Sequence, residues 1–242
     1  MHVDIDHSYP SQNFSNRNND QIDTIILHYT VTNFEKSLSL LTQPEFKVSS
    51  HYLIREDGKI FNLVDPNKKA FHAGMSFWRG KDNLNENSIG IEIVNNGNAP
   101  FTNAQVNSVI ALCLHLKQLF PLIKDQNIIG HSDIAIGRKL DPGKFFPWEK
   151  LAETGIGLWT NLKFTSTDFE ILYRLGHKDS EIYRLKELLK HVGYKVNNLN
   201  NEFDLELKMA IYAFQLHFNP TQANGEFNQA TVKLATALNN YI

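Results

Sequence analysis

The sequence predicts an α/β domain followed by a small domain of three helices. Short apolar runs rich in β-branched residues alternate with a helical pattern over the first part of the chain, as in domains built on a central sheet. Beyond a boundary between Leu158 and Ser180, the apolar residues are spaced for helices alone. We therefore expect one domain over residues 1–165 and a second over residues 175–242.

Five segments of the first domain are predicted strands. Thr24–Tyr29 is continuously apolar, which is typical of a central strand buried on both faces. Residues 51–54 and 60–64 flank a turn that contains Asp-Gly, and this combination favours a β-hairpin. Residues 88–94 alternate, with three isoleucines on one face. Residues 127–131 form a short run that leads into a loop rich in Gly and Pro.

Helices are predicted by spacing and by their end signals. Thr102 or Asn103 is a suitable N-cap for a helix that runs to about Phe120, because Pro121 stops it. The apolar residues of the tail predict three more helices, one closed by Gly193. Their core positions are Ile182, Leu185, Leu188 and Leu189 in the first, Leu205, Met209, Ile211, Tyr212 and Phe214 in the second, and Thr231, Leu234, Ala235 and Leu238 in the third.

Composition excludes several classes of protein. The 242 residues carry a formal net charge of −2, so no basic surplus indicates a nucleic-acid partner. No apolar run reaches the ~18 residues of a membrane span. Cys113 is the single cysteine, which excludes an intrachain disulfide and a cysteine-based zinc cluster. We read Cys113 as a small buried apolar residue.

Three side chains are candidate metal ligands. His28 closes a buried strand, where ligand sites of α/β domains gather. His131 also follows a short strand, and Asp141 comes ten residues later, before a proline. Two imidazoles and one carboxylate suit Zn²⁺ and leave a fourth position for water. On position alone, each histidine could equally be structural.

Two further residues could carry chemistry beside such a metal. Glu92 lies on the face opposite the isoleucines of its strand. A carboxylate in such a strand costs free energy unless it has a catalytic role or a bonded partner. It is a candidate general base, although an arginine partner would also explain it. Lys139 is two residues from Asp141, so its ammonium could stabilise an oxyanion at the same site.

Ordered motifs across residues 20–160 resemble the type-2 N-acetylmuramoyl-L-alanine amidases. The segment GRKLDPG at 137–143, followed by FPW at 146–148, is especially specific. The other matching motifs are IILHYT at 25–30, SHY at 50–52, FHAG at 71–74, NSIGIE at 87–92 and GHSDI at 130–134. The tail resembles the helical peptidoglycan-binding domain that one branch of the family carries, through GY at 193–194, AIYAFQLHF at 210–218, GEF at 225–227 and Thr231.

The resemblance implies a fold and a role for each candidate. It implies a central mixed sheet flanked by helices, with His28, His131 and Asp141 as zinc ligands. It also implies Glu92 as general base and Lys139 as transition-state stabiliser, the same five residues that position had indicated.

Other candidate residues surround these five. His72 resembles a residue that lines the substrate groove, with a turn histidine bonded to local backbone as the alternative. Arg79, Asn83 and Asn87 precede the Glu92 strand and could contact the stem peptide. Asp133 could orient His131, as a carboxylate often does for a ligating imidazole.

The implied reaction is hydrolysis of the amide between the lactyl group of N-acetylmuramic acid and L-alanine of the stem peptide. The partners would be peptidoglycan or muropeptides, in cell-wall turnover and recycling, with the chain acting as a monomer. A non-catalytic peptidoglycan-recognition module and a phage-type endolysin are the alternatives. The tail favours the periplasm or cell envelope, whereas the N-terminal residues, which lack the apolar core of an export signal, favour the cytoplasm.

Overall fold

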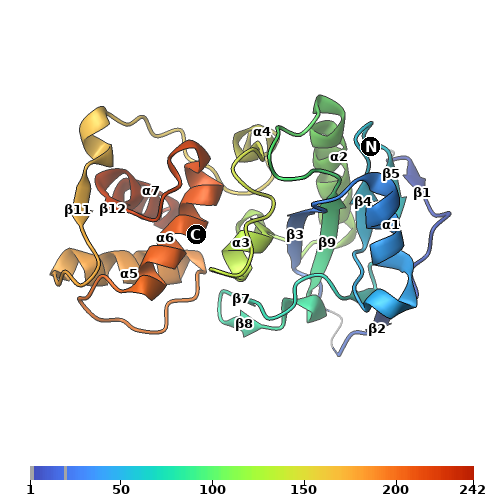
Figure 1. The fold of residues 1–242 in the computed structure, drawn as a ribbon, viewed down its shortest axis with the longest axis horizontal. Coiled ribbons are helices and arrows are strands. Elements are labelled where there is room, and N and C mark those ends of the chain that lie inside the picture. Colours follow the sequence, from blue (N-terminus) through green and yellow to red (C-terminus); the bar gives the residue numbers. More distant parts are fainter. Residues whose placement is uncertain (1–2, 19–20) are drawn as a thin grey trace.

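The structure of the chain is a computed structural model. A six-stranded mixed sheet forms its centre (Figure 1). The structure describes residues 3–18 and 21–242; residues 1–2 and 19–20, in the polar N-terminal segment, lie outside the described part. The sheet has the order β1-β5-β4-β9-β3-β10. Its strands are β1 (Ile5–Asp6), β3 (Thr24–Tyr29), β4 (Tyr52–Ile54), β5 (Ile60–Asn62), β9 (Ser88–Ile93) and β10 (Ile128–Gly130). Strands β4, β9, β3 and β10 are parallel and β5 is antiparallel to β4, so the predicted mixed sheet is confirmed.

The two faces of the sheet have different tasks. On one face, the isoleucines of β9 and the side chains of Ile25 and Leu27 pack in a core with α2 (Asn103–Leu119). The opposite face carries Ile26, which belongs to a second core, and the two polar residues His28 and Glu92, which are paired in register across β3 and β9. Because side chains alternate along a strand, the same alternation that buries the isoleucines brings these polar groups together.

Helix α2 agrees with its sequence signals. Thr102 is the N-cap, and its hydroxyl accepts the N–H of Gln105 while the Gln105 side chain returns to the Thr102 N–H. Such a reciprocal cap satisfies two backbone donors that a helix start leaves free. The helix ends at Leu119 with Phe120 as its C-cap, and Cys113 is fully buried on its core side, as predicted.

Several short elements were not predicted, because they span too few residues to show a period. Helix α1 (Phe34–Thr42) borders the sheet near β4 and β5, and it is the longest of them. The others are β2 (Phe14–Asn16) paired with β6 (Lys68–Ala70), β7 (Phe77–Trp78) paired with β8 (Lys81–Asp82), α3 (His131–Ile134) and α4 (Trp148–Ala152).

The tail folds into the three predicted helices and one feature that the helical pattern missed. The helices are α5 (Ser180–Val192), α6 (Leu205–Phe218) and α7 (Gln229–Asn239). Two short strands, β11 (Ile171–Tyr173) before α5 and β12 (Phe227–Asn228) before α7, pair in antiparallel orientation. The expectation of a purely helical tail was therefore wrong. The pairing places Ile171 with the tail, slightly earlier than the expected start at 175.

The helical domain and the α/β domain share a hydrophobic core. Ile26, Trp78 and Ile129 of the first domain lie in the same buried cluster as Tyr194 and Phe214 of the second. In Figure 1, α3 and α4 lie between the sheet and the helical domain. The helical domain therefore packs on the β3–β10 side of the sheet, through the core that contains Ile26 and Ile129. No helix of the described residues is long and apolar enough to cross a membrane.

Candidate active site

Three candidate metal ligands meet at the carboxyl ends of β3 and β10. His28 is in β3, His131 directly follows β10 as the first residue of α3, and Asp141 lies in the next loop. The two Nδ1 atoms are 2.9 Å apart, and each lies 3.0 Å from Asp141 Oδ2. All three residues are buried, and within the described part of the chain they are the group of three whose atoms could hold one metal ion.

Hydrogen bonds fix which nitrogen each ring presents. His131 Nε2 lies 3.1 Å from the Ala73 carbonyl, which can only accept, so the proton of a neutral ring is on Nε2 and the Nδ1 lone pair is free. His28 Nε2 lies 3.0 Å from His72 Nδ1, and His72 Nε2 lies 3.3 Å from the Ser88 hydroxyl. When His28 Nε2–H donates to His72 Nδ1, and His72 Nε2–H donates to the Ser88 hydroxyl, the Nδ1 lone pair of His28 faces Asp141 in the same way.

Burial and neighbouring charges set the protonation of the ligands. Burial, and then the nearby His131, lower the pKa of His28 to about 4. Burial alone would raise the pKa of Asp141, but the contacts of its carboxylate with the His131 and His28 rings outweigh this effect, and the pKa lies below its usual range. A neutral imidazole and an ionised carboxylate are the forms that bind a metal.

The loop of Asp141 is held against the start of α3. The Ser132 N–H donates to the Asp141 carbonyl at 2.8 Å. Gly130 lies so close that a Cβ there would be 2.6 Å from Pro142 Cδ. A residue larger than glycine at this position would push the Asp141 loop away from His131.

Glu92 is a partly exposed carboxylate whose Oε2 atom is buried. Its Oε2 has no hydrogen-bond partner among the described residues. Burial, and then the negative charge of Asp141, raise the pKa of Glu92 to about 8, against the opposing effect of Lys139. Arginine was the alternative partner, and none of the arginines among residues 3–18 and 21–242 forms an ion pair with Glu92. An incompletely paired carboxylate of this kind is a signature of a functional site.

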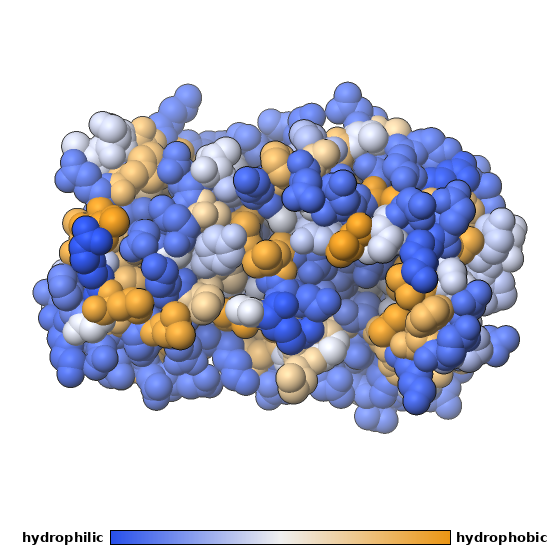
Figure 2. All heavy atoms as spheres, in the orientation of Figure 1, coloured by the Kyte–Doolittle hydropathy of each residue, from blue (hydrophilic) through white to orange (hydrophobic). Residues whose placement is uncertain are grey.

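These residues line one cleft of about 430 Å³. Glu92, His131, Asp141 and Lys139 all border it. Exposed apolar side chains such as Val31 stand at its rim. Figure 2 shows hydrophobic residues of this face in separate patches among hydrophilic ones, so the surface suits a ligand of mixed polarity.

His72 lies in the cleft wall, with its ring against β9. It borders the cleft, as the resemblance implied, and it also supports His28 through the 3.0 Å contact between their rings. A Cβ on Gly90 would be 2.5 Å from the His72 ring, so glycine at position 90 makes room for it. The turn-histidine alternative, with bonds to local backbone, does not describe these contacts.

The three residues expected to contact a stem peptide lie outside this cleft. Arg79 turns to the helical domain, where its guanidinium donates to the Val192 carbonyl at 2.8 Å. Asn87 is at the amino end of β9, buried against Asp23 at 2.5 Å. Asn83 borders a neighbouring cavity, which Arg138 separates from the cleft. Sequence proximity to β9 misled this expectation, because the site lies at the opposite end of that strand.

Asp133 does not orient His131 as expected. The Ala73 carbonyl takes that place, and the Asp133 carboxylate binds Tyr194 and His217 of the helical domain. Sequence reasoning also missed Arg138, which borders the cleft and donates to the Ala73 carbonyl at 2.8 Å. Its position beside Lys139 was the available signal.

Such a fold and site define a hydrolase with a place for one metal ion. Residues 18–144 match the family model described as N-acetylmuramoyl-L-alanine amidase, and the chain belongs to that family. Residues 178–234 match a second model, described as a putative peptidoglycan binding domain.

Relatives of known name resemble the chain over most of its length. The N-acetylmuramoyl-L-alanine amidase AmiD of Escherichia coli is 39% identical over 90% of this chain and 82% of its own. The structure of that amidase in complex with anhydro-N-acetylmuramic acid-L-Ala-D-γ-Glu-L-Lys matches with a TM-score of 0.77, over 91% of this chain and 89% of the other. AmpDh3 from Pseudomonas aeruginosa matches with a TM-score of 0.75 at 30% identity, over 91% and 92% of the two chains.

Proposed function

We propose that this enzyme uses zinc to hydrolyse the amide between the lactyl group of N-acetylmuramic acid and L-alanine of the stem peptide. The observation that carries the proposal is the meeting of two Nδ1 atoms and one carboxylate oxygen near Glu92, whose Oε2 has no hydrogen-bond partner in the described part of the chain. Two nitrogen ligands and one oxygen ligand fit Zn²⁺, and three protein ligands leave room for water and substrate. When bound, zinc supplies a Lewis acid that polarises the carbonyl and activates water.

The residues of the cleft perform the proton transfers and position the charge. Glu92, which borders the cleft beside the metal ligands, takes a proton from the attacking water and then delivers it to the departing amine of L-alanine. Lys139, on the same cleft wall, stabilises the oxyanion that forms at the lactyl carbonyl. His28, His131 and Asp141 hold the metal.

The substrate class follows from the relatives and from the second domain. Solved relatives bind an anhydro-N-acetylmuramic acid tripeptide and an anhydromuramic pentapeptide, so muropeptides are the substrates that we propose here. The domain over residues 178–234 extends the proposal to polymeric peptidoglycan. This setting supports the periplasm or cell envelope as the proposed compartment of the reaction.

Mass spectrometry of the products tests the proposal. Purified muropeptides and intact sacculi are incubated with chelated protein and with zinc-restored protein. Release of free stem peptide that chelation abolishes and zinc restores is the expected result. Binding to sacculi without release of peptide under either condition would show a recognition module instead.

Glu92→Gln tests the role of the base separately. The substitution keeps the size of the side chain and removes its basicity, so we expect one zinc per chain and a loss of turnover of at least ~100-fold. Near-normal turnover in this variant would refute the role of Glu92 without affecting the metal site.

A further inference from the structure

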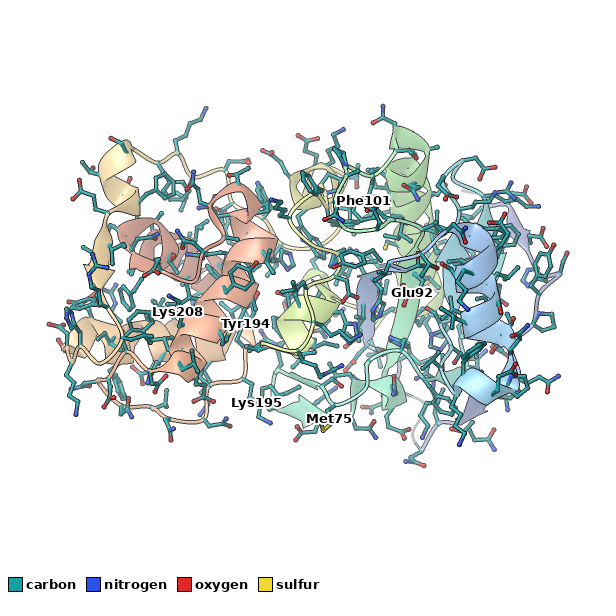
Figure 3. All side chains as sticks on the ribbon, viewed as in Figure 1. Met75, Glu92, Phe101, Tyr194, Lys195 and Lys208 are labelled. Carbon is teal, nitrogen blue, oxygen red and sulfur yellow. The ribbon has the colours of Figure 1, made fainter. Side chains whose placement is uncertain are left out.

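Asp133 lies where the two domains meet, and its side chain is fully buried. Its Oδ1 accepts a hydrogen bond from the Tyr194 hydroxyl at 2.5 Å, and its Oδ2 lies 2.8 Å from His217 Nδ1. Figure 3 shows Tyr194 at the side of the helical domain that faces α3. A buried carboxylate is costly unless its oxygens are bonded, and both of these side-chain partners belong to the other domain.

The same carboxylate holds the backbone of the metal site. Asp133 Oδ2 accepts the N–H of Gly130 at 2.7 Å, and Gly130 directly precedes the ligand His131. The Pro142 ring, next to the ligand Asp141, packs against Gly130 without room for a Cβ between them. The turn that Asp133 closes therefore fixes the positions of two of the three ligands.

The ring of His217 is held in one orientation. It stacks between Trp148 and Phe218, with ring centroids 3.8 Å and 4.0 Å away and interplanar angles of 15° and 10°. Trp148 belongs to α4 of the α/β domain, whereas Phe218 closes α6 of the helical domain. Because the ring is clamped from both domains, its Nδ1 is directed at Asp133 and cannot swing away.

We propose that Tyr194 and His217 are positioning residues of the metal site, which act through the Asp133 carboxylate and the Gly130 backbone. The helical domain thus completes the geometry of a site whose ligands all lie in the other domain. The inference rests on the proposed metal ligands and adds a second task to a domain matched only to peptidoglycan binding. Neither residue touches a ligand, so the effect must travel through the turn at 130–133.

Two variants of the full-length protein remove the hydrogen bonds and keep the rings. Tyr194→Phe loses the hydroxyl, and His217→Phe loses Nδ1–H while it keeps an aromatic ring in the stack. His217→Asn is the conservative replacement, because its amide N–H can still donate to Asp133. The control is Lys186→Met, since Lys186 is fully buried within the helical domain and its Nζ binds Asp204 and Asn200, each at 2.7 Å.

Zinc affinity, measured by competition with a chelator, is the main readout, at a temperature where every variant is folded. Amide hydrogen exchange at Gly130 in the metal-free protein is the second, and kcat/KM on a muropeptide is the third. We expect both Phe variants to bind zinc about tenfold more weakly, as for other supporting partners of metal ligands. Exchange at Gly130 becomes faster in both, while His217→Asn stays closer to the wild type.

The control separates positioning from stability. Lys186→Met should lower the melting temperature and leave zinc affinity and Gly130 exchange unchanged. Unchanged zinc affinity in the Phe variants, or an equal loss in Lys186→Met, would overturn the inference. A wild-type protein that binds no zinc would instead refute the proposed metal, and Gly130 exchange would still decide whether Tyr194 and His217 hold the turn.

Discussion

Replacing Glu92 by Gln should stabilise the metal-free protein, and the gain should grow with pH. The pKa of Glu92 is raised from 4.5 to about 8 by burial and by the charge of Asp141. Between these two values the folded state keeps a proton that the unfolded state releases, so the wild-type free energy of unfolding falls as pH rises through this window. Gln does not titrate, so the variant does not lose unfolding free energy in this way as the pH rises.

The size of the effect follows from the same values. One pKa unit corresponds to about 1.4 kcal/mol, so the full rise sets an upper bound of about 5 kcal/mol at pH 8. Because Glu92 borders an open cleft, solvent reduces the penalty, and we expect a gain of about 2–3 kcal/mol for Glu92→Gln at pH 8. Below pH 4.5 both side chains are neutral and the difference should vanish.

Urea unfolding of chelated protein at pH 5, 6, 7 and 8 measures this difference. Contributions from the histidines cancel, because both proteins contain them. Glu56→Gln, at an exposed glutamate, is the matched control and should show no pH-dependent gain. Parallel stability curves for wild type and Glu92→Gln would refute the reasoning, since they would mean that folding does not perturb the carboxyl group.

Three further perturbations follow from the structure. His131→Ala removes one of three ligands, so zinc content, measured by elemental analysis after dialysis, should fall below one tenth of stoichiometric; retained zinc would exclude His131 as a ligand. Gly90→Ala places a methyl group 2.5 Å from the His72 ring, which should lower the free energy of unfolding by about 1–3 kcal/mol in urea; an unchanged midpoint would show that the ring moves freely. Truncation after residue 165 exposes Ile26, Ile129 and their neighbours in the shared core, so the fragment should precipitate or lose its cooperative thermal transition, and a stable soluble fragment would contradict the shared core.

The sequence predicted those parts of the fold and site that depend on local pattern. The run Thr24–Tyr29, the alternation of β9 and the cap at Thr102 each have a short-range cause, and each was confirmed. His28, His131 and Asp141 could be singled out because the first lies at the end of a strand, the second follows a strand and the third precedes a proline. Their convergence in the structure agrees with that choice, while their roles in catalysis stay predictions.

The contacts between domains could not be predicted in this way. Asp133, Tyr194 and His217 are up to 84 residues apart, and no spacing rule connects them. Arg79 precedes β9 in sequence, yet a β-hairpin carries it to the end of α5. Such pairings depend on how the two domains close on one another, a global property that periodicity within one segment does not record.

The shared core holds the two domains at a fixed distance and orientation relative to one another. A binding module on a flexible linker works by raising the effective concentration of its partner, and its reach grows with the linker. Here the contacts of Asp133 with Tyr194 and His217, together with the common hydrophobic cluster, remove that freedom. If the helical domain binds a glycan, as we propose, the bonds that the cleft can cut are those at one fixed distance and angle from the bound segment of the polymer.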